Sequence, residues 1–312
     1  MHIYITFRLP DAARALVADA LSPDDVCIWG QDLPETERKA AFLQADVAFG
    51  KPPADWLTES QQLRWVQLYS TGFDDYLPLY RSGQRPDVII TNLKGFFAQP
   101  VAESAIAGLM ALYRRIDELA RLQTQKKWVG GAMRPTMHLL HRKHVLVLGA
   151  GAIGQAIQQI LNGFDCTVTF VRNSQPPTMA DLDALLPYTD VVISVLPETT
   201  ETANVFNEAR FALLKPSAVI VNAGRGSLID EDALLIALQS GQLAGAVLDV
   251  TRTEPLPADS PLWHCPNVLL TQHTGGGYDE EDMDKLRVFL RNFVKYKKGL
   301  PLDNIVDFDR GY

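Results

Sequence analysis

Three residues in the second half of the chain have side chains that suit acid–base chemistry on an anionic substrate. They are Arg225 in NAGRG, Glu254 in LDVTRTEPLP and His273 in TQHTGG. A planar guanidinium can bind both oxygens of a carboxylate, and an imidazole can donate a proton to a carbonyl oxygen. A glutamate bonded to the imidazole favours its protonated form. Together the three types suit the reduction of a 2-keto acid, in which a carboxylate adjoins the reacting carbonyl.

Each of the three residues also has an ordinary structural interpretation when it is taken alone. Arg225 could be a surface charge on a glycine turn, Glu254 could begin a proline-rich loop, and His273 could be a partly buried histidine with satisfied hydrogen bonds. Their shared position favours a site, because each lies just beyond the C-terminal end of a predicted parallel strand. An open α/β sheet binds its ligands at that edge.

A glycine motif predicts a binding site for the dinucleotide that would supply the hydride. VLVLGAGAIGQAI places Gly149, Gly151 and Gly154 at GxGxxG spacing. The first glycine permits a tight turn, the second lets the backbone approach a pyrophosphate, and the third lets the helix pack on the strand. An apolar strand precedes the motif, and a helix and another strand follow it. This context favours dinucleotide binding over a simple strand–helix turn.

An arginine, Arg172, stands where an NAD-binding protein usually has an acidic residue. That acid accepts a hydrogen bond from the 2′-hydroxyl of the adenosine ribose, which an arginine cannot do. Its guanidinium can instead pair with a 2′-phosphate, to which Asn173 and Ser174 can donate hydrogen bonds. We therefore predict NADP(H) as the preferred cofactor and NAD(H) as a possible one. The alternative is an arginine that stacks on the adenine of an NAD enzyme.

The elements that would position these residues are short apolar runs that alternate with helical patterns. Such runs, apolar throughout, are typical of parallel strands covered on both faces. The second half of the chain has six of them, at 144–149, 166–171, 190–196, 218–223, 244–250 and 267–272. The first hundred residues have four more, at 3–7, 47–50, 65–70 and 87–92. The pattern predicts two Rossmann-like α/β domains, each a doubly wound parallel sheet.

The order of these elements also predicts the domain boundaries. One long helix is expected from about Pro100 to Thr124, and another in the segment 278–299. The last forty or so residues are expected to return to the first domain. We therefore expect a discontinuous substrate domain at 1–98 and 275–312, with a dinucleotide-binding domain at 99–274 inserted in it. The active site is expected between the two domains.

Composition excludes several other classes of protein. The chain has 312 residues, of which 47% are hydrophobic, and a formal net charge of −8 without a basic run, which argues against a nucleic-acid partner. Three widely spaced cysteines without a CxxC motif favour a reducing compartment. The N-terminus lacks a signal-peptide pattern, and no apolar run is long enough to span a bilayer. We expect a cytoplasmic protein with no membrane partner.

The same motifs, taken together, resemble the D-2-hydroxyacid dehydrogenase family over nearly the whole chain. They are LGAGAIG, NAGRG, LDV, EPLP…SPLW and TQH. The resemblance implies that Arg225 binds the substrate carboxylate and carbonyl, that His273 is the acid/base, and that Glu254 is its partner. It further implies that the backbone amides of Thr71 and Gly72, in STGFD, hold the substrate carboxylate, although this turn could also be a simple strand end.

The resemblance also implies a set of residues around the cofactor. Asp249 would face the nicotinamide carboxamide, Val101 would pack against the nicotinamide, and Pro197 follows the strand that borders the adenosine. The full predicted cofactor site comprises Val101, Gly149, Gly151, Ala152, Ile153, Gly154, Arg172, Asn173, Ser174, Leu196, Pro197, Ala223, Gly224, Asp249 and Gly275. No metal site is predicted, because His138, His141 and His144 have no further ligand nearby in the sequence and cannot share one helix face.

The chain departs from the family pattern at three places. Gln272 replaces the usual proline before the catalytic histidine, the tail HTGGGYDE is richer in glycine, and Arg172 replaces the acid. The length, Arg172 and the ending IVDFDRGY resemble the glyoxylate/hydroxypyruvate reductase branch, which implies a small 2-keto acid as substrate. The resemblance also implies a homodimer formed through the helix after Pro100 and the next segment. The alternative is a dinucleotide-dependent binding protein of the corepressor type, with little turnover.

Overall fold

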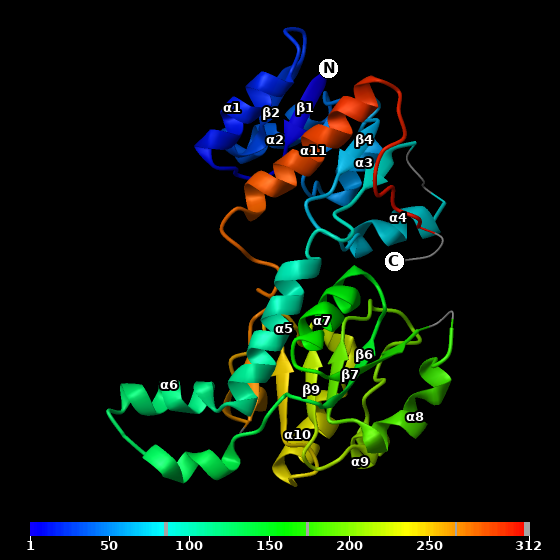
Figure 1. Cartoon of the computed structure of the whole chain (residues 1–312). Coiled ribbons are helices and arrows are strands. Elements are labelled where there is room, and N and C mark those ends of the chain that lie inside the picture. The colour runs from blue at the N-terminus through cyan, green and yellow to red at the C-terminus, as the bar shows by residue number, and fades with distance from the viewer. Residues whose placement is uncertain (84–86, 173–174, 266, 309–312) are drawn as a thin grey trace. The chain divides into compact units, whose positions relative to one another are not determined.

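The computed structural model of the chain describes residues 1–83, 87–172, 175–265 and 267–308. The chain forms two compact units, which are coloured along the sequence in Figure 1. We call Phe97–Gly277 the central unit, and Met1–Phe96 with Tyr278–Tyr312 the discontinuous unit. Each contains one parallel sheet with helices against it. The predicted fold class, with one α/β unit inserted in the other, is confirmed.

The central unit is built on a six-stranded parallel sheet. Its strands are β6 (His144–Leu148), β7 (Thr167–Val171), β8 (Val191–Ser194), β9 (Val219–Asn222), β10 (Gly245–Leu248) and β11 (Val268–Leu270). Their order across the sheet is β11-β10-β9-β8-β6-β7. The chain therefore moves to one side of β6 for β7 and to the other side for β8 and later strands. Such a switch point opens a crevice at the carboxyl ends of the strands.

Both faces of this sheet are covered, which explains why its strands are apolar throughout. One face packs against α5 (Ala98–Tyr113) and α7 (Ala152–Asn162). The other face packs against α8 (Leu182–Leu185), α9 (Glu208–Leu213) and α10 (Glu231–Gln239). Every residue of β8 and β9 is buried. The loops at the strand ends are thus attached to a rigid double-sided core.

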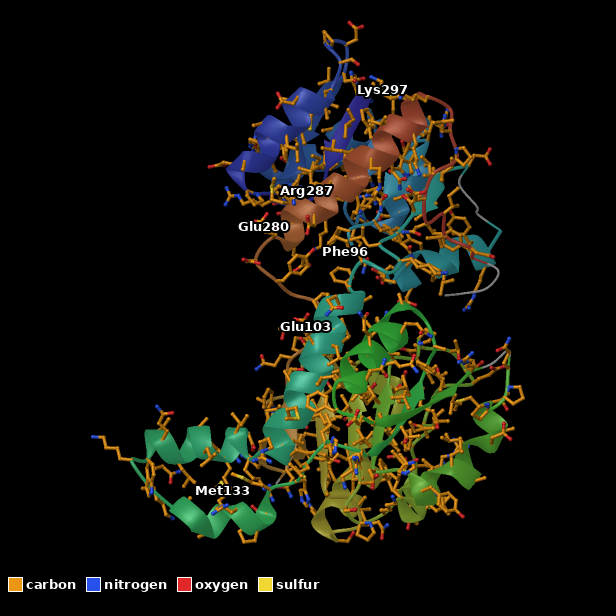
Figure 2. The ribbon with its side chains drawn as sticks, in the orientation of Figure 1. Phe96, Glu103, Met133, Glu280, Arg287 and Lys297 are labelled. Carbon is orange, nitrogen blue, oxygen red and sulfur yellow. The ribbon has the colours of Figure 1, made fainter. Side chains whose placement is uncertain are left out.

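The single long helix expected from Pro100 to Thr124 is wrong. The segment forms two helices, α5 and α6 (Ile116–Thr124), which are separated at Arg115, where the backbone is left-handed with a φ of 56°. As a result, Ile116 does not continue the buried apolar face of α5, and its side chain is 54% exposed. Figure 1 shows α6 and the segment after it projecting from the body of the central unit, and Figure 2 marks Met133 in that segment.

The discontinuous unit has a five-stranded parallel sheet in the order β2-β1-β3-β4-β5. The strands are β1 (His2–Ile5), β2 (Val26–Trp29), β3 (Val47–Phe49), β4 (Trp65–Gln67) and β5 (Ile89–Thr91). The helices are α1 (Asp11–Ala20), α2 (Glu35–Phe42), α3 (Ala54–Glu59), α4 (Leu77–Arg81) and α11 (Glu281–Lys297). Four of these strands were predicted, but β2 was not. It is an edge strand without a fully buried residue, although its sequence VCIW is as apolar as those of the predicted strands.

Helix α11 returns the end of the chain to this sheet, as predicted for the last forty or so residues. The ring of Phe289 stacks on Phe49 and on Trp65, with centroid distances of 4.7 and 5.5 Å. Figure 2 shows Glu280 beside the first turn of α11 and Lys297 at its last turn. The negative charge near the N-terminus of α11 and the positive charge near its C-terminus both interact favourably with the helix dipole. Among the described residues, no helix is long and apolar enough to cross a membrane.

Candidate active site

The three predicted catalytic residues lie together at the carboxyl end of the central sheet. Arg225 follows β9, Glu254 is in the loop after β10, and His273 follows β11. All three line one pocket of about 390 Å³. The further lining residues are Glu198, Ala203, Asn204, Gly226, Ser227, Val250, Thr251 and Arg252. Residues from three separate loops thus meet in one pocket because parallel strands all end at the same edge.

His273 and Glu254 form a hydrogen-bonded pair. Nδ1 of His273 lies 2.6 Å from Oε2 of Glu254, and the backbone amide of Thr251 donates to Oε1 of the same carboxylate at 3.0 Å. Because an ionised carboxylate only accepts hydrogen bonds, Nδ1 carries the hydrogen of this bond. That leaves Nε2 as the nitrogen that can exchange a proton with a substrate. The side chain of His273 is 54% exposed, so a ligand can reach the ring.

The loop that carries Arg225 is fixed by its own backbone and by Asn222. The buried Asn222 side chain accepts a hydrogen bond from the Gly224 amide at 3.2 Å and donates to the Arg225 carbonyl at 2.9 Å. A Cβ on Gly226 would stand 2.0 Å from the Thr251 backbone. Only glycine therefore lets the Arg225 loop pack against the Glu254 loop, which holds the guanidinium and the carboxylate in one pocket.

The glycine motif has the geometry that a dinucleotide requires. Gly149 has a φ of 108°, which L-residues rarely adopt, and a Cβ on Gly154 would lie 2.1 Å from the Gly149 carbonyl oxygen. Around Gly151, at the N-cap of α7, a Cβ would meet nothing within 4 Å. Ala152 and Ile153 begin the helix, whose first amides have no partner within it. This open helix end fits a pyrophosphate.

Comparisons with known proteins agree with this geometry. A family model described as D-isomer specific 2-hydroxyacid dehydrogenase, NAD binding domain, matches residues 106–275. The chain belongs to the D-isomer-specific 2-hydroxyacid dehydrogenase family. It is therefore an NAD(P)-dependent oxidoreductase, and the predicted family, enzyme class and nicotinamide cofactor are confirmed.

Three relatives illustrate the similarity. The glyoxylate/hydroxypyruvate reductase B of Pectobacterium carotovorum subsp. carotovorum is 33% identical over 270 residues, which are 83% of each chain. A solved D-isomer specific 2-hydroxyacid dehydrogenase family protein from Aeromonas salmonicida subsp. salmonicida is 30% identical, with a TM-score of 0.84 over 99% of each chain. Another from Xanthobacter autotrophicus Py2, in complex with NADPH and MES, is 25% identical, with a TM-score of 0.78 over 100% of this chain and 99% of that one. The predicted resemblance to the reductase branch is confirmed.

In this dehydrogenase, four of the predicted cofactor-site residues also lie together. Val101, Ala223, Asp249 and Gly275 line one small cavity beside the pocket residues. The cavity is also lined by Ser104, Ala105, Val221, Asn222, Val247 and Thr271. The Ser104 hydroxyl donates to the Gly275 carbonyl at 3.1 Å, which ties α5 to the loop after β11.

The predicted adenosine-side residues lie after β7 and β8. Arg172 follows β7, with its guanidinium carbon 5.3 Å from the centre of the Phe170 ring and Nη1 3.4 Å from Oε1 of Gln175. No carboxylate forms an ion pair with Arg172 in the part of the chain that the structure describes. Asn173 and Ser174, the other two predicted phosphate ligands, lie outside the described residues.

The loop after β8 carries Pro197 and a further predicted cofactor-site residue, Leu196. The Pro197 carbonyl accepts a hydrogen bond from the Thr202 hydroxyl at 2.8 Å, and the Leu196 amide donates to the Ser194 hydroxyl at 3.4 Å. The backbone of Leu196 also lies against Gly224, where a Cβ would be 2.5 Å from the Leu196 carbonyl oxygen. The loop after β8 therefore packs directly on the loop that carries Arg225.

The predicted anion-binding turn of the discontinuous unit follows β4. The Asn92 side chain donates to the Thr71 carbonyl at 2.8 Å, and the Ser70 hydroxyl donates to the Gly72 carbonyl at 2.9 Å. Neither the Thr71 amide nor the Gly72 amide donates to an acceptor within the described ranges. The turn is thus held through its carbonyls, and its two amides are available to an anion.

Sequence reasoning missed the eight further residues that line the pocket, among them Arg252, Asn204 and Ser227. The Arg252 guanidinium donates to the Asn204 side chain and, at 3.1 Å, to the Ile229 carbonyl, so it joins the loops after β8, β9 and β10. The Ser227 hydroxyl is buried without a hydrogen-bond partner among the residues that the structure describes. Arg252 lies between two predicted site residues in LDVTRTE, and that position was the available signal.

Proposed function

We propose that this dehydrogenase reduces a small 2-keto acid, of the glyoxylate or hydroxypyruvate type, to the D-2-hydroxy acid. The observation that carries the proposal is the His273–Glu254 pair in one pocket with Arg225. The names of relatives such as the Pectobacterium glyoxylate/hydroxypyruvate reductase B support the substrate class.

Each residue has a defined part in the proposed reaction. The dinucleotide, when bound, supplies the hydride that reduces the keto carbon. Arg225 binds the substrate carboxylate and polarises the neighbouring carbonyl. His273 donates the proton on Nε2 to the carbonyl oxygen as the alcohol forms. Glu254, which accepts the Nδ1 hydrogen, compensates the positive charge of the imidazolium before that proton is given up.

We assign the two units complementary parts in this reaction. The central unit is the dinucleotide-binding domain, and the pyrophosphate binds at the start of α7. The discontinuous unit is the substrate domain, in which the amides of Thr71 and Gly72 also hold the substrate carboxylate. Two consecutive amides that donate to no acceptor among the described residues support this role. Asp249 and Val101 are assigned to the nicotinamide, because both line the small cavity beside the catalytic residues.

We further propose that NADPH is the preferred hydride donor. Arg172 supports this, since its guanidinium forms no ion pair with a carboxylate of the described residues, and a 2′-phosphate would supply the missing negative charge. The solved Xanthobacter relative, which contains NADPH, gives independent support. Reduction is then the expected direction.

The test of this function is the initial rate of NADPH and NADH oxidation with glyoxylate and with hydroxypyruvate. The expected result is turnover with both acids and a kcat/KM for NADPH at least tenfold above that for NADH. Arg172→Asp should reverse this preference, because an acid repels the phosphate and accepts from the ribose hydroxyl. A clear preference of the wild-type protein for NADH would contradict the role of Arg172. No turnover with any 2-keto acid would contradict the enzymatic proposal and favour a binding protein of the corepressor type.

We also propose that the protein is a homodimer that uses α6 and the segment after it. Four large apolar side chains of this region are exposed: Ile116 at 54%, Leu119 at 40%, Trp128 at 95% and Leu139 at 63%. A partner subunit would remove them from water. Light scattering at micromolar concentration should give twice the mass of the 34.6 kDa chain. A monomeric mass would contradict this proposal, and the expected cytoplasmic location stays a prediction.

A further inference from the structure

The loop that presents His273 has an unusual backbone. Gln272 has a φ of 55° and His273 a φ of 56°, so two consecutive residues other than glycine are left-handed. L-residues seldom adopt this conformation, and a proline cannot, because its ring holds φ near about −65°. The usual proline of the family could therefore not occupy position 272 in this conformation. A residue other than proline at position 272 is therefore required for the left-handed backbone seen here.

Asp249 holds this loop from both of its ends. Its carboxylate accepts hydrogen bonds from the Thr271 hydroxyl at 2.7 Å, the Thr274 amide at 3.1 Å and the Gly275 amide at 3.1 Å. Its backbone carbonyl accepts a bond from the His273 amide at 2.6 Å. Residues before, at and after the left-handed pair are thus bonded to one residue, which is only 9% exposed.

The same contacts fix where the imidazole stands. The His273 amide is bonded to the carbonyl of Asp249, the residue directly after β10, and the ring is bonded to Glu254 in the loop that follows. The Glu254 carboxylate is in turn bonded to the Thr251 amide. A change of φ at 272 would move the ring relative to a carboxylate that is itself held in place.

Gln272 acts in this arrangement through its backbone. Among the described residues, neither its amide nor its side chain forms a hydrogen bond with another residue. A substitution at 272 therefore removes no contact of this kind. It changes only the ease with which the chain adopts a positive φ.

We propose that Gln272 and Asp249 are positioning residues for the acid/base. The left-handed pair at 272–273, clamped by Asp249, places the His273 ring against Glu254 with Nε2 directed to the pocket. This inference rests on the proposed reduction of a 2-keto acid. It adds a second role for Asp249, whose Oδ1 accepts three bonds from the loop while Oδ2 accepts one longer bond, at 3.3 Å from the Gly275 amide.

The first experiment changes the residue at position 272, so that a positive φ becomes either forbidden or easier to adopt. Gln272→Pro forbids the left-handed backbone, whereas Gln272→Gly permits it freely. We expect kcat with hydroxypyruvate to fall about 100-fold in Gln272→Pro, because a displacement of about 1 Å has an effect of that order. The Kd for NADPH, measured by fluorescence, should change by less than about threefold. Gln272→Gly should keep kcat within about threefold of the wild type.

A matched control separates this effect from a loss of stability. Asp165 also has a positive φ, 54°, but it precedes β7 at the opposite edge of the central sheet. Asp165→Pro should lower Tm and leave kcat within about twofold. If Gln272→Pro does not fold, Gln272→Val is the substitute, because a β-branched residue resists a positive φ while keeping the amide. Its kcat should fall at least fivefold with unchanged binding of NADPH.

A third variant tests the clamp. Asp249→Ala removes both acceptor oxygens, so the Thr271 hydroxyl and the Thr274 and Gly275 amides lose this acceptor. We expect kcat to fall at least tenfold even at saturating NADPH, beyond any change in Kd for the cofactor. If the wild-type protein turns over and Gln272→Pro or Gln272→Val does so within about threefold of it, the inference is wrong. If the wild-type protein reduces no keto acid, the proposed function itself has failed.

Discussion

The two sheets of the molecule have the same parallel architecture but carry different groups at their carboxyl edges. In the central unit, the edge carries Arg225, Glu254 and His273, whose side chains line one pocket. In the discontinuous unit, the corresponding edge carries the turn at Thr71 and Gly72, whose amides have no acceptor within the described residues. One edge presents ionisable side chains and the other presents backbone donors.

The two edges are also stabilised in opposite ways. The reactive side chains of the central edge are held by backbone groups, such as the Thr251 amide bonded to Glu254. The turn that presents the backbone amides of the discontinuous edge is held by side chains, such as that of Asn92, which donates to the Thr71 carbonyl. In the proposed reaction, the same fold would supply proton transfer at one edge and anion binding at the other, because the loops of the two edges carry different residues.

The largest expected effect is that of removing the imidazole from the central edge. His273→Ala should lower kcat about 1,000-fold, within the range by which a general acid accelerates a reaction. The Kd for NADPH should not change, because the ring contacts Glu254 rather than the glycine motif. Stopped-flow kinetics and cofactor fluorescence would measure the two quantities. A variant with more than about a tenth of the wild-type kcat would mean that another group donates the proton.

A smaller effect is expected from changing the shape of the cation while its charge is kept. Arg225→Lys should lower kcat/KM about 100-fold, because an ammonium cannot form two parallel bonds to a carboxylate. Steady-state kinetics with hydroxypyruvate would measure this loss. A variant within about fivefold of the wild type would show that Arg225 acts as a point charge only.

A substitution that loosens the turn at the discontinuous edge should change KM rather than kcat. Asn92→Ala removes the bond to the Thr71 carbonyl and the one from the Lys94 amide, at 2.8 and 3.1 Å, which hold the anion-binding turn. We expect KM for hydroxypyruvate to rise about tenfold, consistent with about 1 kcal/mol for a hydrogen bond. A fall in kcat with unchanged KM would remove the distinction between the two edges.

The smallest expected effect concerns the stability of the discontinuous unit alone. Burial acts to raise the pKa of Asp25, but hydrogen bonds from Lys297, the Ser22 amide and the N-terminal ammonium outweigh it and lower the pKa to about 2. Because the folded pKa is below that of the unfolded chain, this stabilisation is present above about pH 4 and lost as the pH falls towards 2.

Asp25→Asn tests this dependence. At pH 7 the variant should have a Tm a few degrees below that of the wild type, and the difference should shrink as the pH falls from about 4 to 2. Calorimetry across this range would measure it. Equal Tm values at pH 7 would show that the contact of Asp25 with α11 contributes nothing measurable.

The features that the sequence predicted are those that depend on local residue types. The six strands of the central sheet are visible because they are short, mostly apolar runs, and the proposed catalytic residues because they follow those strands. The break at Arg115 was not visible, since arginine is a good helix former and its positive φ is set by packing. The bond between Arg252 and Asn204 and the left-handed backbone at Gln272 likewise arise from residues distant in sequence.

The central claim is that the pocket reduces a 2-keto acid to the D-isomer. The most direct measurement is chiral chromatography with mass spectrometry of the glycerate formed from hydroxypyruvate and NADPH deuterated at the transferred position of C4. The account predicts D-glycerate with one deuterium on C2, and none of it with His273→Ala on the same timescale. L-glycerate, a product without deuterium, or equal yield from the His273 variant would contradict the account.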